Sequence, residues 1–473
     1  MTLHSLYDAV RDGTGSGRDI ALSTGQRDWS FRALLAAAEA LAMRLAPRVE
    51  PGDAVSLQVT DPVAAAVATL GCDLVQVCLL RRDPSAPNAL PGRILHDGLA
   101  HAPRDGEAQV LGTPGLWLRS DGPLENSPVR LPRGAQVFFT SGSTGEPVGV
   151  VRSVRSILAD AFRVSRFLGY APDHPVVSAA PLFHAYGFNY GLVGPLLAGA
   201  PLRCIPARSV PSQLDRAVSA TGARTLIALP AHYGLLSATS HRDAYPGLND
   251  LRSAVSAGAP LGVGTTSDVV RRHRIALYNC YGSSEAGAVT LVRLEGDEDS
   301  GYIGAPLPGV SVHVDDSQSS RGTGELMLRS TSLAEGRLLT ADHVVPLTDE
   351  DGWYRTGDLA RLRQPQGIDL VGRMSTAINV AGEKVSPSEI ERVLTKHPHV
   401  LDAVVTAAPD SARGQVPVAR VVLRLPTPPD ELLGWCRTWL APHAVPRRVE
   451  PVAEIARSAT GKALWSEPRK RAT

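Results

Sequence analysis

The feature that most constrains the fold is a repeated alternation of short apolar runs with helical stretches. The runs are PVVSAAP (175–181), PLRCIP (201–206), RTLIALP (224–230), LRSAVSAG (251–258) and IALYNCYG (275–282). Each ends in Gly or Pro, as expected where a buried strand passes into a loop. This alternation predicts an α/β fold with a mostly parallel, buried sheet. Ligands of such folds collect at the carboxyl ends of the strands.

The N-terminal part shows the same alternation. Residues 31–46 place Leu and Ala at helical spacing, and 53–59 form a short apolar run. Residues 62–80 predict a helix followed by a strand, and 135–140 predict a strand. We therefore expect a large N-terminal domain of mixed sheets flanked by helices.

The pattern changes after about residue 300. Residues 309–316 and 323–330 alternate polar and apolar side chains, which favours antiparallel strands. Residues 386–389, Ser-Pro-Ser-Glu, have the pattern of a capping box with Pro at the first helical position. Strand, strand and helix patterns follow. We therefore predict two domains, residues 1–372 and a small mobile α+β domain of residues 373–473.

The composition excludes several classes of function. The net charge is +1 and 43% of the residues are apolar, so no bulk charge favours nucleic acid or membrane binding. The 5 Cys residues are scattered, which is typical of reduced thiols. We see no signal peptide and no run of the roughly 18 apolar residues that a membrane span needs. We expect a cytoplasmic protein, monomeric or homodimeric.

The stretch FFTSGSTGEPVG (138–149) concentrates Gly, Ser and Thr directly after a predicted strand. Glycines let a backbone approach a ligand closely, and successive N–H groups form a concavity that binds anions. A polyphosphate is the natural ligand for such a loop. The stretch alone is also consistent with a Ser/Gly surface turn, and it lacks the Gly-Lys-Ser/Thr of a Walker A loop.

Five further stretches carry polar groups on predicted turns. They are SAGAPL (256–261), NCYGSSEAG (279–287), WYRTGDLA (353–360), GRM (372–374) and SATGKALW (458–465). In the second, an aromatic ring precedes hydroxyls and the carboxylate of Glu285, so it offers a stacking surface, phosphate donors and an oxygen ligand for Mg²⁺. Asp358 follows a turn from which a carboxylate can bind two ribose hydroxyls. Each stretch alone is equally consistent with a solvated loop.

The identity and order of these stretches resemble the adenylate-forming superfamily of acyl- and aryl-CoA ligases, carrier-protein-loading adenylation domains and luciferases. The resemblance covers about residues 25–465. It implies ATP and Mg²⁺ as cofactors, and CoA or phosphopantetheine as the thiol acceptor. A carrier protein, if one is used, would be a separate chain. The resemblance also implies that the small domain rotates between two half-reactions, on a hinge at Ser375 that brings in the loop around Gly382.

The resemblance assigns roles by position. It implies that residues 140–149 wrap the ATP phosphates, that Glu285 holds Mg²⁺ and that Lys462 is the catalytic lysine. Further nucleotide contacts fall on Thr140, Ser141, Gly142, Ser143, Thr144 and Gly145 at the phosphates, Ala257, Gly258, Tyr281 and Gly282 at the base, Ser284 at the α-phosphate, and Asp358 and Arg373 at the ribose. These roles fit the chemistry, because a carboxylate attacking the α-phosphorus of ATP needs cations to offset the repulsion between two anions.

Three positions depart from the family pattern. The phosphate loop usually ends Pro-Lys-Gly, but here Val148 replaces the lysine, and Arg152 or Arg155 are candidates to substitute for it. Ser375 replaces a charged hinge residue. Asn379 stands where many CoA ligases have Lys, and INVAGEKV (378–385) is similar to the aryl-acid-activating branch.

The segment PLFHAYGFNYG (181–191) indicates the acid substrate. Amino-acid-activating domains have Asp after the Phe, where this chain has His184, and an imidazole cannot replace a carboxylate that pairs with an α-ammonium group. We therefore expect an aryl or acyl acid. The predicted pocket, with His184 as catalytic gate, comprises His184, Phe188, Asn189, Tyr190, Pro230, Tyr233 and Gly282. A packed or surface histidine is the alternative for His184.

Two other functions stay open. An adenylating enzyme that uses a nitrogen nucleophile, forming an amide or N–N bond, would share every ATP-binding residue. A non-catalytic AMP-binding relative is suggested by Val148 alone. A dehydrogenase of the Rossmann type is disfavoured, because no G-x-G-x-x-G opens a helix after the first strand.

Overall fold

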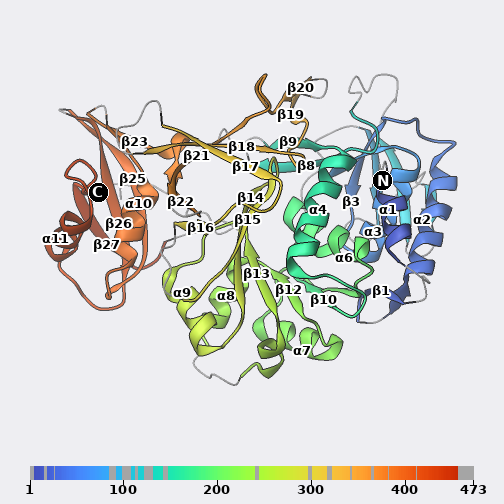
Figure 1. Ribbon diagram of the computed structural model, residues 1–473, viewed down its shortest axis with the longest axis horizontal. Coiled ribbons are helices and arrows are strands. Elements are labelled where there is room, and N and C mark those ends of the chain that lie inside the picture. The colour runs from blue at the N-terminus through green and yellow to red at the C-terminus, as the bar shows by residue number, and fades with distance from the viewer. Residues whose placement is uncertain are drawn as a thin grey trace, which may run out of the picture.

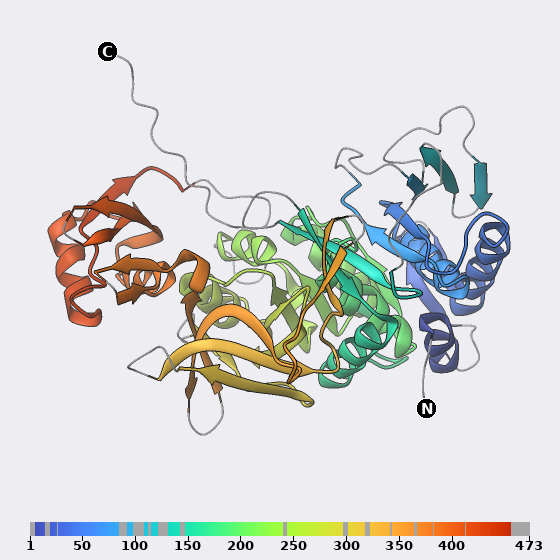
Figure 2. The ribbon, with the colours of Figure 1, turned by 90° about the horizontal axis from the view of Figure 1, so that it is seen from above.

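The computed structural model describes residues 5–14, 19–25, 27–84, 92–97, 108–111, 115–121, 131–141, 147–239, 244–296, 301–316, 322–340, 343–363, 367–381, 383–411 and 413–455. The fold is mixed α/β, as predicted. Figures 1 and 2 show a large N-terminal part built on several sheets and a smaller C-terminal part lying to one side of it.

The first sheet is mostly parallel and carries the apolar runs of the central sequence. Its strand order is β15-β14-β13-β12-β10-β11-β1-β2, and only the outer pairs β14–β15 and β1–β2 are antiparallel among the described strands. The strands are β1 (Ile20–Ser23), β2 (Asp28–Ser30), β10 (Val176–Ser178), β11 (Leu202–Cys204), β12 (Thr225–Ala228), β13 (Ser253–Ala257), β14 (Leu277–Ser283) and β15 (Gly287–Arg293). The five predicted runs are β10 to β14, which confirms them.

The second sheet brings together the predicted phosphate strand and a strand from much later in the chain. Its order is β20-β19-β9-β8-β4-β3-β5-β7-β6. The strands are β3 (Ala54–Gln58), β4 (Cys78–Arg81), β5 (Gly92–His96), β6 (Ala108–Leu111), β7 (Leu116–Asp121), β8 (Gln136–Ser141), β9 (Pro147–Arg152), β19 (Gly336–Thr340) and β20 (His343–Pro346). Residues 147–149, which the sequence analysis assigns to the phosphate loop, instead begin β9, so the loop between the strands is shorter than expected.

Helices pack against the first and second sheets. They are α1 (Leu6–Gly13), α2 (Phe31–Leu45), α3 (Pro62–Leu74), α4 (Val154–Leu168), α5 (Ala185–Phe188), α6 (Gly194–Leu197), α7 (Pro211–Thr221), α8 (Pro230–Ser237) and α9 (Val263–Ser267), with short turns η1 (Asn189–Val193), η2 (Pro246–Asp250) and η3 (Asp268–Arg272). One core joins both sheets to α2, α3 and α4, and a second lies between the first sheet and α7 and α8. Side chains from two faces thus exclude water from β10, β12 and β13, which explains their continuous apolar sequence.

Helix α4 passes through the first of these cores and carries a buried carboxylate, Asp160. Its N-terminus is capped by Ser153, whose side chain accepts a hydrogen bond from the N–H of Ser156, and it ends at Gly169 in the left-handed conformation (φ 69°). These caps fix the length of the helix and so the position of Asp160 in its middle.

The third sheet is antiparallel, as predicted for the region after residue 300. Its order is β16-β22-β21-β18-β17, with β16 (Tyr302–Gly304), β17 (Val310–Asp315), β18 (Thr323–Ser330), β21 (Tyr354–Arg363) and β22 (Gly367–Arg373). It has its own core, which includes Leu326, Leu328 and Ile368. A short turn, η4 (Met374–Thr376), leads out of β22.

The C-terminal part has a separate core. It comprises β23 (Ile378–Val380), β24 (Glu383–Val385), α10 (Pro387–Thr395), β25 (Val400–Asp410), β26 (Gly414–Leu423), α11 (Pro429–Trp439) and β27 (Arg448–Val452). The helix and strands predicted here are confirmed, but the capping box is wrong. Ser386 makes no cap hydrogen bond, because its Oγ donates to the carbonyl of Val371 at 2.6 Å. That bond ties α10 to β22.

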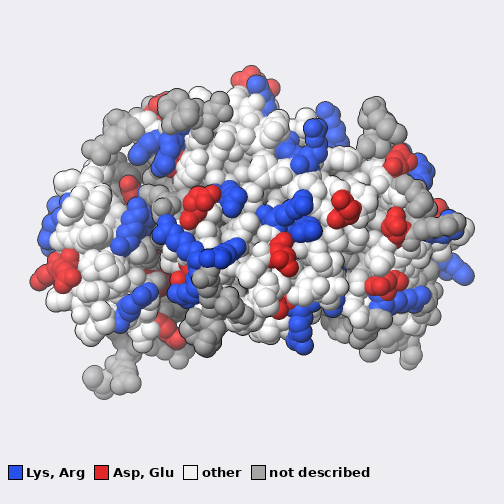
Figure 3. Space-filling model, turned by 60° about the horizontal axis from the view of Figure 1, so that its bottom comes forward, with Lys and Arg blue, Asp and Glu red and all other residues white. Residues whose placement is uncertain are grey.

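Surface charge and helix length agree with the composition. Basic and acidic side chains are interspersed over the face in Figure 3, in keeping with the net charge of +1. Across the described ranges, every helix is too short or too polar to cross a membrane.

Candidate active site

The carboxylate of Asp358 joins two other predicted nucleotide residues. Tyr281 Oη donates to Asp358 Oδ2 at 2.6 Å, and Arg373 Nε lies 2.8 Å from Asp358 Oδ1. The three residues come from β14, β21 and β22, and Asp358 and Arg373 are directly opposite each other in the ladder. Burial, and then the Asp358 charge, raise the pKa of Tyr281 well above its usual value, so the phenol remains a donor. An ionised carboxylate has about four lone-pair sites, so both oxygens of Asp358 can still accept ribose hydroxyls.

The backbone after β13 is open beside this triad. Ala257 pairs with Cys280, which places Gly258 beside Tyr281. Gly258 is exposed, has φ of 93°, and has no atom within 4 Å of where a Cβ would stand. A flat ring could therefore approach the peptide plane from that side. Gly282, the next residue after Tyr281, is exposed as well.

Glu285, the predicted metal ligand, is held by an arginine that the sequence analysis did not single out. Arg337 Nε and Nη2 donate to Glu285 Oε1 at 3.1 and 2.9 Å. Arg337 Nη2 also lies 3.2 Å from Tyr354 Oη, and its guanidinium stands 5.8 Å from the centre of the Tyr354 ring. Within the described chain, no residue bonds Glu285 Oε2, so that oxygen can take a metal ion.

The remaining nucleotide and hinge positions are only partly described. Thr140 Oγ1 donates to the carbonyl of Val148 across the β8–β9 pair at 3.4 Å. Ser284 lies half-buried between β14 and β15, and Ser375 is exposed in η4 just after β22. The backbone of Ser141 ends β8. Gly142, Ser143, Thr144, Gly145, Gly382 and Lys462 lie outside the described residues.

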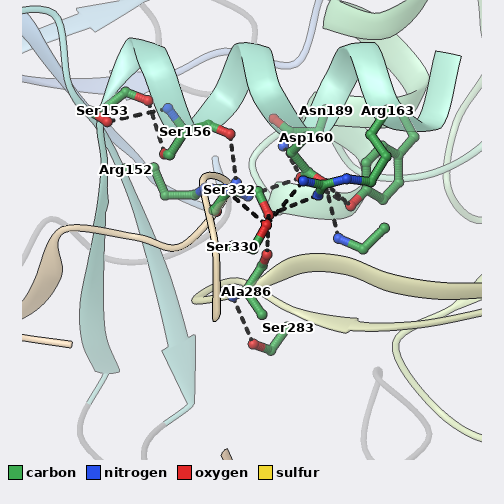
Figure 4. Close-up of polar contacts among 12 residues, drawn as sticks. Arg152, Ser153, Ser156, Asp160, Arg163, Asn189, Ser283, Ala286, Ser330 and Ser332 are labelled. Carbon is green, nitrogen blue, oxygen red and sulfur yellow. Dashed lines mark hydrogen bonds and ion pairs between the residues drawn. The ribbon is translucent and has the colours of Figure 1, made fainter. Parts of the chain in front are cut away.

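A buried polar cluster around Asp160 connects the elements that carry the site (Figure 4). Asp160 accepts hydrogen bonds from Asn189 Nδ2 at 2.6 Å, Tyr190 Oη at 3.0 Å and the N–H of Ala288 at 3.0 Å. It also pairs with Arg152 Nη1 at 3.2 Å, and both of these side chains are 0% exposed. These contacts give Asn189 and Tyr190 structural roles, so we do not retain them in the proposed acid pocket.

The two cations suggested as substitutes at the phosphate loop lie elsewhere. Arg152 is fully buried, and besides Asp160 its Nη2 donates to the carbonyl of Ser332 at 2.8 Å. Arg155 lines an open cavity of about 490 Å³ with Glu335 and Arg329. Arg155 follows the end of β9 that is remote from Pro147. Because a strand rises about 3.3 Å per residue, the length of β9 separates Arg155 from Pro147. Arg152 is therefore committed to the buried core, and Arg155 follows the end of β9 remote from Pro147, so we do not retain either as the substitute cation.

The residues predicted to line the acid pocket lie around the ends of β12 and β13. Tyr233 Oη donates to the carbonyl of Val255 at 3.0 Å, and Phe188 is buried against Phe138. Pro230 is the first residue of α8 and is half-buried. His184 precedes α5 with an accessible ring, yet desolvation by the surrounding protein lowers its pKa, which favours the neutral imidazole.

Tyr186, between His184 and Phe188, was not predicted. Its Oη lies 3.1 Å from the carbonyl of Ala228 and 2.9 Å from that of Val255, so it bridges the ends of β12 and β13. Tyrosine at this position gives no distinct sequence signal, and neither do Arg337 or Asp160. Their importance depends on contacts between elements that are distant in the sequence.

Known proteins show the same organisation. Residues 11–338 match the model of the AMP-binding enzyme family, and residues 389–462 match that of the AMP-binding enzyme C-terminal domain. A probable CoA ligase of Humulus lupulus is 28% identical over 351 residues, which are 72% of this chain and 64% of that protein. The chain spans 61% to 66% of the length of four plant CoA ligases and ligase-like proteins that it matches.

Solved structures share the fold. ATP-bound MatB from Rhodopseudomonas palustris has a TM-score of 0.80 at 19% identity, covering 97% of each chain. The amide bond synthetase McbA from Marinactinospora thermotolerans has a TM-score of 0.77 at 22% identity, also covering 97% of each chain. With family models matching both parts of the sequence, the chain belongs to the AMP-binding enzymes, the adenylate-forming superfamily.

Proposed function

We propose that the protein activates a small aryl or acyl acid with Mg²⁺ and ATP, and transfers the acyl group to a thiol. The observation that carries this proposal is the Asp358 carboxylate, held between Tyr281 and Arg373 beside the open backbone of Gly258. A buried carboxylate with spare lone pairs suits a ribose, and an open peptide plane suits a flat base. CoA or a phosphopantetheine arm on a separate carrier protein is the proposed acceptor.

The first half-reaction needs little proton transfer. The acid carboxylate attacks the α-phosphorus, a bond forms between that phosphorus and the acid oxygen, and the bond to pyrophosphate breaks. The nucleophile is already ionised, so no general base is needed. Bound Mg²⁺ would offset phosphate charge, and Mg²⁺ commonly uses one or two carboxylates together with substrate phosphates. The free Oε2 of Glu285 fits that requirement, and the described residues hold no cluster of three or more acidic, His or Cys ligands.

The chain's own residues then position the reactants. We propose that Asp358 and Arg373 orient the ribose, and that Lys462 approaches the α-phosphate from the domain of residues 373–473. Rotation about Ser375 would exchange Lys462 for the loop around Gly382 in the second half-reaction. The change from the third sheet to the C-terminal sheet between Arg373 and Ile378 supports a hinge at this point.

An aryl acid fits the aromatic surroundings best. Of the proposed lining, His184 is exposed and Pro230 half-buried, while Phe188 and Tyr233 are almost fully buried in this structure. The lowered pKa of His184 favours an uncharged imidazole, which would add no charge to repel or bind a second ionic group. An α-amino acid is disfavoured, because none of these side chains is a carboxylate that could pair with its ammonium group.

The test is pyrophosphate release from Mg·ATP without thiol, across benzoates, cinnamates, short acyl acids and amino acids. We expect turnover with one class of acid, lost in Lys462→Ala. With that acid, CoA, a phosphopantetheinylated carrier protein and amines are then compared as acceptors. Amines are included because an amide bond synthetase has the same fold. Transfer to amines alone would contradict the proposal that the acceptor is a thiol. Absence of pyrophosphate release with every acid would contradict the proposed adenylation step.

A further inference from the structure

We propose that Arg337 supplies the phosphate-facing positive charge that the chain lacks at Val148, and that it orients Glu285 for Mg²⁺. This inference rests on the proposed function, because it assigns a further residue to the same nucleotide site. The loss of the loop lysine would then be compensated from a different strand of the same sheet.

Strand register places Arg337 on the required face. In the antiparallel pair β9–β19, Arg337 lies directly opposite Val150. Residues opposite each other point to the same side of a sheet, and so do residues two apart along one strand. Val148 and Thr140, which is opposite Val148 on β8, therefore share this face with Arg337. Diagonal neighbours on a sheet are roughly 7–8 Å apart, which is within the reach of an arginine side chain.

The chain leading into β19 is fixed against the strand–turn that carries Glu285. Ser332 Oγ donates to the carbonyl of Ala286 at 2.9 Å, and the N–H of Ala334 donates to the carbonyl of Glu285 at 2.7 Å. The carbonyl of Ser332 accepts a hydrogen bond from Nη2 of the buried Arg152. Arg337 thus reaches Glu285 from a segment that is already hydrogen-bonded to the backbone of Glu285 and Ala286. Arg152 contributes by anchoring this segment.

The ion pair between Arg337 and Glu285 leaves one polar atom on each side chain available for a ligand. Both guanidinium bonds end on Glu285 Oε1, and of the described residues none bonds Glu285 Oε2 or Arg337 Nη1. The Arg337 side chain is 42% exposed and that of Glu285 only 13%. A guanidinium keeps its charge at any working pH, and a nitrogen of it that is not yet bonded can donate a charge-assisted hydrogen bond to a phosphate oxygen. Oε2 is then free for a metal ion while Nη1 is free for a phosphate oxygen.

Other arginines around β8 and β9 are either engaged in contacts or lie at the other end of β9. Arg152 and Arg155 lie at the other end of β9, as described above. Arg81 is 2% exposed, bonds Gln136 and Thr69, and stacks 3.7 Å from the centre of the Phe188 ring. Arg337 is therefore the accessible guanidinium that the described part of this face offers.

Nucleotide binding tests the inference without relying on turnover. Calorimetry would measure Mg·ATP and AMP binding to the full chain and to Arg337→Met, with folding checked by thermal melting. A charge-assisted bond to the β- or γ-phosphate predicts that Arg337→Met weakens Mg·ATP binding by about tenfold or more while AMP binding changes by less than about twofold. Adding Val148→Lys to Arg337→Met should recover part of the loss, because it restores a cation on the same face.

The control is Arg361→Met. Arg361 is an exposed residue of β21, and among the described residues its side chain bonds only Thr323. This variant should bind both nucleotides like the wild type. Equal weakening of Mg·ATP and AMP in Arg337→Met would show a purely structural role and overturn the inference. Unchanged or tighter Mg·ATP binding would overturn it too, because Arg337 would then be idle or would compete with Mg²⁺ for Glu285. If the wild type bound neither nucleotide, the proposed function itself would fail.

Discussion

Asp160 shows how much of the site depends on one buried residue. It bonds side chains from β9 and η1 and the backbone of β15, and neither it nor Arg152 is exposed. Asp160→Ala leaves the Arg152 guanidinium without its buried counter-charge, so we expect a loss of roughly 3–5 kcal/mol in the free energy of unfolding. Urea denaturation followed by tryptophan fluorescence measures this.

Arg152→Met should cost less than Asp160→Ala, since the Asp160 carboxylate keeps its bonds from Asn189, Tyr190 and Ala288. The control Asp8→Ala removes an exposed partner of Arg11 and should change stability by less than about 1 kcal/mol. An Asp160→Ala protein as stable as this control would show that the buried pair contributes nothing net.

Tyr281 offers a second prediction at this scale. Tyr281→Phe keeps the ring but removes the donor to Asp358 Oδ2. Because one hydrogen bond that orients the proposed ribose acceptor, Asp358, is lost, AMP affinity should fall by about threefold to tenfold. Calorimetric titration with AMP measures this affinity. Tyr281→Ala also removes the stacking surface, so its affinity for AMP should be lower still. Wild-type affinity in Tyr281→Phe would argue against Asp358 as the ribose ligand.

At the scale of single residues, candidates could be chosen from the sequence only where a motif carried them. Asp358, Arg373, Tyr281 and Glu285 stand in recognisable stretches, and the structure brings the first three together. Arg337 was missed because its meaning depends on the pairing of β19 with β9, which no local pattern encodes. The burial of Arg152 was missed for the same reason.

At the scale of elements, the sequence was most informative for the buried strands. β10, β12 and β13 are buried on both faces, so their apolar runs are continuous and bounded by Gly or Pro. The capping box at Ser386 failed because a tertiary contact competes for the same hydroxyl. Its Oγ bonds the carbonyl of Val371 rather than the first turn of α10. A local signature cannot reveal a partner on another sheet.

The contact between α10 and β22 leads to a prediction about this junction. A Cβ at Gly372 would collide with Ser386 Oγ. Gly372→Ala should therefore separate α10 from β22 and increase hydrogen–deuterium exchange around residues 373–390, while exchange in α2 and α3 stays as in the wild type. Mass spectrometry of peptic peptides reports both regions.

Gly434→Ala is the matched control, since a Cβ at Gly434 within α11 meets no atom within 4 Å. Alanine is the better helix former by up to about 1 kcal/mol, so this variant should exchange no faster than the wild type. Unaltered exchange near residue 373 in Gly372→Ala would mean that the Ser386 contact does not hold the junction.

At the scale of the whole molecule, buried histidines make stability depend on pH. Burial lowers the pKa of His174 and His232, which are 6% and 2% exposed, below the ordinary value of about 6.5. The unfolded chain therefore binds protons at a higher pH than the folded one, so stability present above about pH 6.5 is lost as the pH falls below it. The thermal midpoint should decrease from pH 7.5 to about pH 5.5.

His232→Asn should reduce that slope. Its amide oxygen can accept the Leu229 N–H bond that His232 Nδ1 now accepts at 3.0 Å, but it does not titrate. The same melts at the same pH values measure the change. A midpoint that rises on acidification, or an unchanged slope in the variant, would contradict the burial argument.

The central claim is that an acid oxygen attacks the α-phosphorus of ATP in this site. The most direct measurement uses an accepted acid labelled with ¹⁸O in its carboxylate, with Mg·ATP and a thiol, followed by mass spectrometry of the AMP. When the thiol attacks the acyl carbon, the oxygen between that carbon and phosphorus leaves with AMP. We predict AMP that carries one labelled oxygen from the acid. Unlabelled AMP, or label in inorganic phosphate alongside ADP, would contradict the account.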